Sequence, residues 1–235
     1  MSKVARVGVA AGTVVVVLLA GGVYAWLSRP VSSPRPFAVR PSTGASPSPA
    51  TGAVAGTWVV DQGSAAGYRV KERFVGQAAD SEAVARTSTV TGQMVLAASA
   101  TGLDLRSAQF SADISKLKSE DANATHGSAV RDVFVGRIYL ETAVYPMATF
   151  VARPLAVASG TSAGTLPVPG TFTVHGVTHD ITIPLQVTRN GDRLEVLADF
   201  PLHYPDYKID VPQVPFTSAN PDATVEVHLF LKRQA

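Results

Sequence analysis

The chain has 235 residues and no cysteine, which excludes disulfides, thiolate metal sites and lipidated-cysteine anchors. Its formal charge of +2 is unevenly distributed, because residues 1–56 hold five of the 20 basic side chains and none of the 18 acidic ones, which leaves 15 basic and 18 acidic residues for the remainder. This mildly acidic remainder has no basic run and is not expected to bind nucleic acid.

The first predicted element is a membrane anchor. Residues 7–27 carry no charge, and these 21 residues at about 1.5 Å each would span roughly 32 Å, enough to cross the hydrocarbon core. Tyr24 and Trp26 would lie at the outer interface. A cleaved signal peptide is the alternative, although its apolar region usually has only about 7–15 residues. We expect an uncleaved single-pass anchor in the cell membrane, with residues 1–6 in the cytoplasm and the chain after the anchor outside it.

A linker follows the predicted anchor. Residues 28–55 are rich in Pro, Ser, Ala, Gly and Thr, and a segment of this composition cannot bury enough apolar surface to fold. We therefore predict disorder over the whole linker. At about 3.1 Å per residue it could reach on the order of 85 Å, so the domain beyond it could move above the bilayer while remaining close to it.

Residues 56–235 are predicted to form one all-β domain, which is long enough for a sizeable core. Apolar and polar residues alternate there with a period of two, as in strands with one dry and one wet face. Threonine and charge on the outward faces are typical of an exterior in water. Eight or nine strands are expected, within residues 57–61, 67–74, 87–97, 104–115, 147–153, 170–185, 193–200 and 223–231. A barrel of about eight antiparallel strands can be filled by side chains or hold one ligand, and alternation alone does not decide between these.

The clearest hairpin is Gly170–Leu185. Phe172 and Val174 share one face of its first strand, and the apolar residues at 181, 183 and 185 share one face of its second strand. Gly176 and Asp180 are predicted to bound the turn between them.

Residues 115–146 interrupt the alternation. A polar loop and a short helix around residues 128–135 are predicted for this segment. Phe134, Ile138 and Tyr139 could plug or gate the barrel lumen, or they could simply cap the core.

No set of catalytic or metal-binding residues is evident. His175 and His179 are four residues apart, a spacing that makes a metal pair on a helix but not across a hairpin turn. The Gly-x-Ser-x-Gly string at residues 160–164 is not followed by a predicted helix and so makes no nucleophile elbow, and no phosphate-binding glycine loop occurs in the sequence. Neither an enzyme nor a cofactor is therefore predicted. If Glu72 shares a face with Tyr68 and Val70, its charge would lie inside the barrel and would need an Arg or Tyr partner.

Three blocks of the sequence resemble the YceI family. They are Gly170–Leu185 (GTFTVHGVTHDITIPL), Arg131-Asp132 followed by Tyr145–Phe150 (YPMATF), and Gly56–Asp61 followed by Tyr68–Val70. Their order and spacing fit the family over nearly the whole chain after the linker. The resemblance implies a lipocalin-like barrel that holds a long isoprenoid chain in an apolar interior, with a helix and loop over one end. The family often has histidine near position 72, where this chain has glutamate.

The resemblance implies that a polyisoprenoid lipid, such as a quinone or a polyprenol, is the partner of the barrel. The residues expected to contact the lipid are Tyr68, Val70, Met94, Phe110, Ile114, Phe134, Phe150, Phe172, Val174, Ile183, Leu185, Phe200, Tyr207 and Val227. Tyr207 could equally pack at the barrel rim. The alternative function is a filled barrel that acts as a cell-envelope interaction module for a protein or a wall polymer. An open sheet edge would also favour a homodimer.

Overall fold

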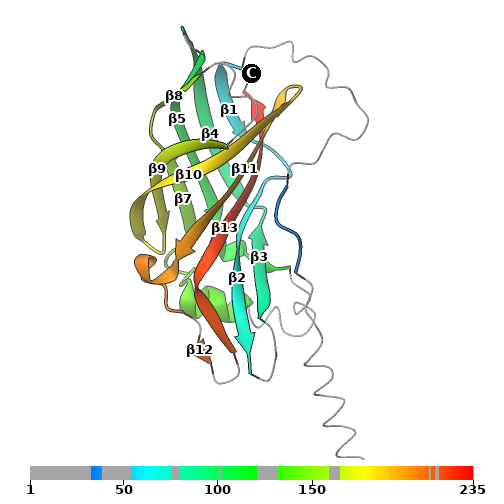
Figure 1. Ribbon diagram of the computed structural model, residues 1–235, viewed down its shortest axis with the longest axis vertical. Helices are drawn as coiled ribbons and strands as arrows, with labels where there is room; N and C mark the ends of the chain where they lie inside the picture. The colour runs from blue at the N-terminus through cyan, green and yellow to red at the C-terminus, as the bar shows by residue number, and fades with distance from the viewer. Residues whose placement is uncertain are drawn as a thin grey trace, which may run out of the picture.

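The computed structural model describes residues 33–38, 54–75, 80–100, 102–120, 132–158, 165–211, 213–214 and 217–234. In this part of the chain, thirteen antiparallel strands form one sheet that curls into a barrel (Figure 1). The strands are β1 (Gly56–Val60), β2 (Ala65–Phe74), β3 (Ser81–Thr87), β4 (Val90–Ser99), β5 (Gly102–Asp113), β6 (Lys118–Ser119), β7 (Met147–Ala152), β8 (Leu155–Ala158), β9 (Thr165–Val174), β10 (Val177–Asn190), β11 (Arg193–His203), β12 (Gln213–Val214) and β13 (Thr217–Arg233). The short helical elements are η1 (Ile114–Lys116), η3 (Val135–Tyr139) and η4 (Tyr204–Tyr207).

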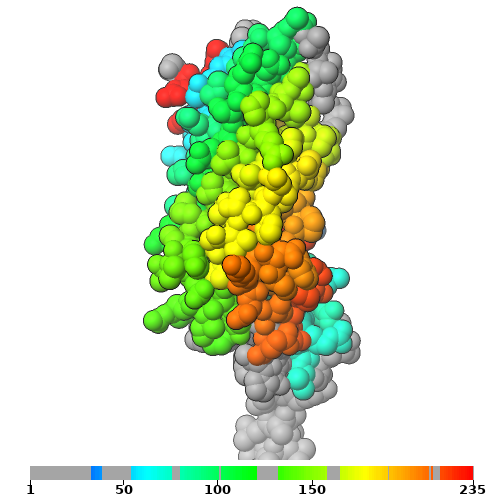
Figure 2. Space-filling model, turned by 90° about the vertical axis from the view of Figure 1, so that its left-hand side faces the viewer, coloured from blue at the N-terminus to red at the C-terminus, as the bar shows by residue number. Residues whose placement is uncertain are grey.

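The barrel closes because β1 pairs with strands on both of its sides. Trp58 of β1 is the register partner of Met94 on β4 and of Arg233 on β13. The closed order is β1-β4-β5-β7-β9-β10-β11-β13, which confirms the predicted antiparallel barrel of about eight strands. The wall formed by β5, β7, β9 and β10 is unbroken in the space-filling view (Figure 2, green to yellow).

Further along β13, β2 takes the place of β1. β2 pairs with β13 through residues such as Val225, whose partner is Tyr68, and β3 pairs with the other side of β2. β6 then pairs with β3 through Ala85 and Ser119. These strands continue the wall toward the end of the barrel that carries η3 and β12 (Figure 1).

Inward residues of neighbouring strands pack in layers. Val196 on β11 lies opposite Leu229 on β13, and Leu194 lies opposite Leu231. All four side chains are buried and pack together with Trp58. The period of two along each strand is what brings these residues to one face.

The outward faces of β11 and β13 differ from the sequence expectation of an exterior in water. Glu195 and Glu226 occupy outward positions, yet they are only 4% and 1% exposed. Glu226 is paired with Arg69 and Arg86, and Glu195 with His228. Pairing of this kind makes the burial of a carboxylate tolerable.

Strand β3 was not predicted from the sequence. Its inward positions are occupied by the small residues Ala83 and Ala85, and its other positions include Glu82 and Arg86. Alanine and glutamate are depleted in strands, and only Val84 and Thr87 of the seven residues are β-branched, so the strand signal of this segment is weak. It becomes a strand because β2 offers it a partner.

The predicted turn of the hairpin is too long. Val174 pairs with Val177, so only His175 and Gly176 form the turn. Both residues have positive φ, 52° and 70°, which suits the right-handed twist of a two-residue hairpin. Asp180 consequently lies within β10, where its register partner is Thr171.

The helix predicted around residues 128–135 is present over its described part and extends further than expected, to Tyr139. Residues 132–134 form one α-helical turn that continues as the π-helical turn η3. Residues 128–131 lie outside the described part of the chain.

Part of the predicted linker has a defined place. Residues 33–38 lie against the outer wall of the barrel, and Val54 accepts a hydrogen bond from the Trp58 indole at 2.9 Å. Disorder is therefore wrong for these residues, while residues 39–53 and the predicted anchor at 7–27 lie outside the described residues. Among the described residues, the structure contains no helix with the length and apolar character that a membrane crossing needs.

The closure predicts where the barrel is most sensitive to mutation. Leu231 is fully buried between β1 and β11, so Leu231→Ala should lower the free energy of unfolding by about 2–5 kcal/mol through the cavity it leaves. Val151 is 41% exposed on β7, and Val151→Ala should cost less than about 1 kcal/mol. Urea unfolding followed by circular dichroism measures both, and similar losses would contradict the packing described.

Candidate functional site

The barrel encloses a cavity of about 860 Å³. Its lining is overwhelmingly apolar and comes from seven of the eight strands of the closed ring, all but β1, and from β2, β3, β8, η1, η3 and η4. Cavities of about 300–1,000 Å³ that are apolar with a few polar groups are typical small-molecule sites. The cavity is therefore the candidate functional site.

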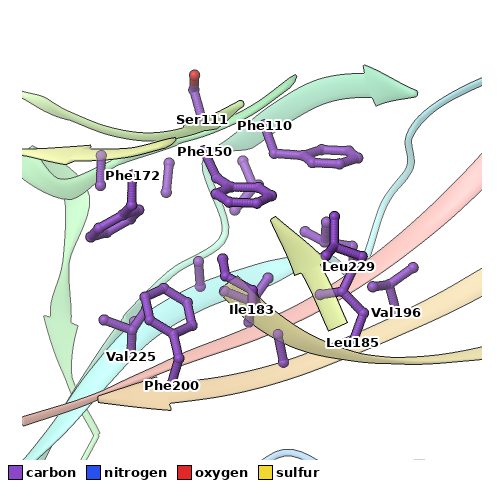
Figure 3. Close-up of a pocket in the computed structure, with 18 of the residues that line it drawn as sticks. Phe110, Ser111, Phe150, Phe172, Ile183, Leu185, Val196, Phe200, Val225 and Leu229 are labelled. Atoms are coloured by element: carbon purple, nitrogen blue, oxygen red, sulfur yellow. The ribbon is translucent and has the colours of Figure 1, made fainter. Parts of the chain in front are cut away.

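Aromatic residues form one wall of the cavity. Phe110 on β5 is the register partner of Phe150 on β7, which is in turn the partner of Phe172 on β9. The three rings project into the same space (Figure 3). Phe172 also meets Phe200 of β11 edge to face, with 5.3 Å between ring centroids, a favourable geometry for aromatic pairs.

Aliphatic residues face these rings from the opposite side. Ile183, Leu185, Val196, Val225 and Leu229 come from β10, β11 and β13 (Figure 3). Like the rings, they offer no hydrogen-bonding group, so they favour an apolar occupant.

Small residues next to the phenylalanines keep the lumen open. Ala112 pairs with Ala148, and Ala108 pairs with Ala152, on either side of the Phe110–Phe150 pair. All four alanines line the cavity. Because interiors are otherwise close-packed, inward alanines at these positions leave volume that no side chain fills.

One end of the cavity is polar. Glu72 and Tyr68 of β2 line it together with Tyr204 of η4. Burial raises the pKa of the Tyr204 hydroxyl well above its ordinary value of about 10, and the nearby Tyr68 and Glu72 raise it further. The Glu72 charge considered from the sequence thus does face the lumen, where Tyr68 and Tyr204 lie near it.

Polar residues also mark the other end. Thr188 and Arg189 of β10 line the cavity, and Arg189 pairs with Leu194 near the start of β11, whereas Tyr204 follows the end of that strand. The cavity therefore extends along the barrel between two polar ends.

The helical cap contributes residues other than those expected. Tyr139, Val135 and Leu140 line the cavity. Phe134 and Ile138 do not line it and are 40% and 53% exposed, although the Phe134 ring meets that of Tyr139 at 5.5 Å. Only one side of the helical turn faces the cavity, so Tyr139 is the aromatic residue of the cap that lines it.

The two hairpin histidines hold η4 in place. His175 Nε2 lies 2.8 Å from Glu141 Oε2, and its Nδ1 lies 3.1 Å from the Tyr207 carbonyl oxygen. His179 Nε2 lies 2.9 Å from the carbonyl oxygen of Asp206. Within the described ranges no group of three His, Asp or Glu side chains is arranged as a metal site.

Of the fourteen residues predicted to contact a ligand, twelve line this cavity and Phe134 and Tyr207 do not. Tyr207 is buried beside the cavity, where its ring packs on Phe172 and His179 at 5.8 and 4.9 Å. Its position matches the rim alternative. Sequence reasoning missed Tyr204, whose aromatic neighbour Tyr207 stands three residues along the same turn.

Comparison with known proteins places this geometry in context. The YceI-like domain model matches residues 58–231. The polyisoprenoid-binding domain from Saccharophagus degradans, implicated in plant cell wall breakdown, is 19% identical with a TM-score of 0.56 over 75% of this chain and 98% of that chain. Burkholderia cenocepacia BcnA is 18% identical with a TM-score of 0.51 over 70% of this chain and 95% of that chain. None of the curated proteins matches this chain significantly.

The raised pKa of Tyr204 predicts a loss of stability at high pH. Above about pH 10 the unfolded chain releases the Tyr204 proton while the folded chain retains it, so the folded state binds more protons and its stability falls as pH rises. One such group contributes at most about 1.4 kcal/mol per pH unit. Tyr204→Phe removes this contribution, so urea unfolding between pH 9.5 and 11.5 should show a shallower decline. Parallel declines in the two proteins would contradict the assignment.

Proposed function

The chain belongs to the YceI-like domain family, and we propose that it is a binding protein that holds one polyisoprenoid-type lipid, a quinone or a polyprenol, in the barrel lumen. The observation that carries the proposal is the apolar cavity of about 860 Å³ along the barrel. The family, and a structural neighbour named as a polyisoprenoid-binding domain, support binding rather than catalysis.

Burial of the chain of such a lipid would supply the affinity. Each buried CH₂ contributes roughly 0.8 kcal/mol, so an isoprenoid tail can be held without polar contacts, although ordering the tail offsets much of this gain. The phenylalanine wall and the inward alanines give alternating bulky and open sites, which suits a chain with regularly spaced methyl branches. The polar ends at Tyr204 and Arg189 offer places for a head group.

The alternative function, an interaction module with a filled core, is less well supported. A filled barrel would show no continuous internal space, whereas this lumen has several hundred cubic ångströms. Closure through β1 leaves neither side of β1 unpaired, so the expected homodimer gains no support from an edge at that strand.

We propose further that the barrel is exported and tethered to the cell membrane by residues 7–27. The support is the uncharged segment of 21 residues followed by the Pro/Ser-rich linker. Protease added to intact spheroplasts should digest the barrel or release it from the cells. A barrel that survives protease until the cells are lysed would contradict export.

Filling the lumen should abolish binding without removing any polar group. Ala148 faces the cavity from β7, and Val151, three residues along the same strand, is 41% exposed and faces outward. Ala148→Trp should weaken binding of a long-chain polyprenyl quinone at least about tenfold, a loss of about 1.4 kcal/mol. Val151→Trp should bind as the unmodified protein does. Co-elution in gel filtration, quantified by mass spectrometry, measures both.

The controls separate blocked binding from misfolding. Both variants should retain the circular dichroism spectrum of the barrel. The milder Ala112→Leu, at the register partner of Ala148 on the neighbouring strand β5, should give an intermediate loss. Full binding by Ala148→Trp, or equal loss in the outward variant, would contradict a lumenal site.

A further inference from the structure

The outer wall of the barrel carries a buried cluster of charges. The side chains of Arg69 on β2, Arg86 on β3 and Glu226 on β13 are 11%, 10% and 1% exposed. Arg69 Nε donates to Glu226 Oε1 at 2.6 Å, and Arg86 Nη2 donates to Glu226 Oε2 at 2.9 Å. Glu82 and Glu120 pair with the same guanidinium groups from the flanks. Charged side chains on the outside of a barrel normally face water, so their burial requires a cover.

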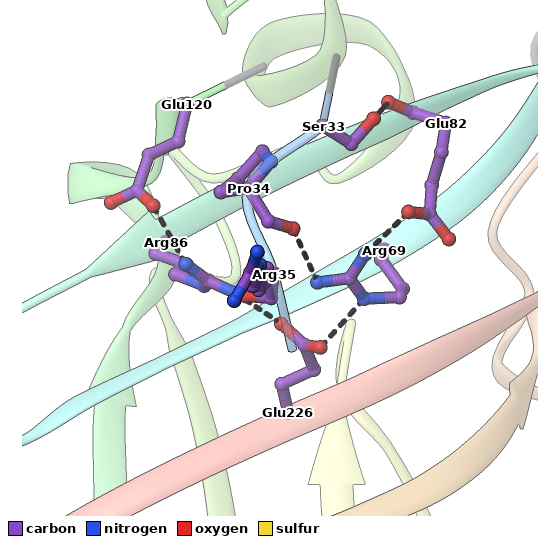
Figure 4. Close-up of polar contacts among 8 residues, drawn as sticks. All are labelled: Ser33, Pro34, Arg35, Arg69, Glu82, Arg86, Glu120 and Glu226. Carbon is purple, nitrogen blue, oxygen red and sulfur yellow. Dashed lines mark hydrogen bonds and ion pairs between the residues drawn. The ribbon is translucent and has the colours of Figure 1, made fainter. Parts of the chain in front are cut away.

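Residues 33–38, which we name the latch segment, provide that cover. Ser33 Oγ donates to the Glu82 carbonyl oxygen at 2.6 Å. Arg69 Nη2 donates to the Pro34 carbonyl oxygen at 3.1 Å, and Arg86 Nη2 donates to the Arg35 carbonyl oxygen at 2.9 Å (Figure 4). Each guanidinium thus donates hydrogen bonds to glutamate carboxylates and also to a carbonyl oxygen of the latch segment. The latch segment is therefore a hydrogen-bonding partner of the cluster.

Phe37 anchors the other end of the latch segment. Its ring lies under the Arg86 guanidinium, 4.1 Å from ring centroid to Cζ, and 5.4 Å from the His228 ring. His228 is held in turn by the buried Glu195, with 2.7 Å between Nε2 and Oε1. The cation–π geometry is favourable because the guanidinium is partly desolvated.

The sequence of the latch segment suits this site. Pro34 and Pro36 have no N–H groups and restrict the backbone, which leaves carbonyl oxygens as its main hydrogen-bonding groups. Arg69 and Arg86 place their N–H donors opposite the carbonyl oxygens of Pro34 and Arg35. We define Arg69, Arg86, Glu226 and His228 as the latch site.

The direction of the latch segment fixes which end of the barrel it enters from. Ser33 lies beside Glu82, the second residue of β3, and Phe37 lies beside Arg86 further along that strand. Residue 81 at the start of β3 is the register partner of Glu72. The chain therefore reaches the latch site from the barrel end at which Glu72 lines the cavity.

We propose that the latch segment binds the latch site to hold the barrel beside the membrane, with the Glu72 end of its cavity toward the bilayer. This proposal rests on the proposed anchor at residues 7–27. Only residues 28–32 separate that anchor from Ser33, and five residues at about 3.3–3.6 Å each reach no more than about 18 Å. The undocked linker would reach on the order of 85 Å. Docking would therefore keep the Glu72 end of the barrel close to the bilayer, whereas the undocked barrel could move away from the bilayer as far as the linker allows.

The docking is tested with a spin label on the full chain in lipid vesicles. The chain has no cysteine, so Ala38→Cys, at an exposed position next to Phe37, gives a single nitroxide site. Its electron paramagnetic resonance spectrum should show an immobilised component that Phe37→Ala removes. Arg35→Ala is the matched control, because the Arg35 side chain is exposed and its carbonyl group is retained. A mobile spectrum before substitution, or no change with Phe37→Ala, would overturn the proposal.

The orientation is tested by energy transfer to acceptor lipids in the same vesicles. Fluorophores are placed at Val75→Cys, which follows β2 and is 78% exposed, or at Asp192→Cys in the turn at the opposite end of the barrel. Transfer should be stronger from position 75, and Phe37→Ala should reduce that difference. Equal transfer, or stronger transfer from position 192, would overturn the orientation.

Failure of the latch is distinguishable from failure of the proposed function. A chain that does not insert into vesicles would overturn the anchor and the membrane placement. Binding of a polyprenyl quinone by the Phe37→Ala variant is expected to be unchanged, because Phe37 is outside the lumen. Loss of quinone binding in this variant would overturn the separation between latch and cavity on which the proposal depends.

Discussion

Closure of the ring through β1 is the constraint on which the rest of the structure depends. Because β1 pairs with both β4 and β13, the sheet cannot flatten, and the inward side chains face a space of fixed size. Alanine pairs occupy inward positions on β5 and β7 beside the phenylalanines, so the side chains do not fill that space. The cavity of about 860 Å³ arises because the inward side chains are together too small to fill the space inside the closed wall. A long apolar ligand is the occupant that fits it.

Charge is kept out of the middle of the lumen. Glu72 and Arg189 lie at its two ends, while the dense cluster around Glu226 lies on the outer wall beneath residues 33–38. A buried ion pair adds little net stability because desolvation opposes the attraction, but removing one partner is strongly destabilising. We infer that the cluster contributes more to the geometry of the wall than to its net stability. It fixes how β2, β3 and β13 adjoin and where the N-terminal segment crosses them.

The sequence predicted the fold and most of the cavity because both follow from period-two alternation. The long strands rich in β-branched or aromatic residues were recognised, and most of their inward residues line the lumen, although Trp58 and Leu231 do not. Strand β3 escaped because Ala83 and Ala85 carry little strand signal. Phe134 and Tyr207 lie in helical turns, where alternation does not indicate direction. The burial of Glu226 depends on a segment about 190 residues away, and no local pattern contains such information.

The most direct test of the lipid-binding account is mass spectrometry of an organic extract from the barrel. Residues 33–235 would be exported from a bacterial host and purified without detergent, and the protein would be quantified in the same sample. The account predicts about one equivalent of an isoprenoid lipid per barrel. A well-folded barrel that yields no isoprenoid, and that also fails to take up added quinone or polyprenol, would contradict it.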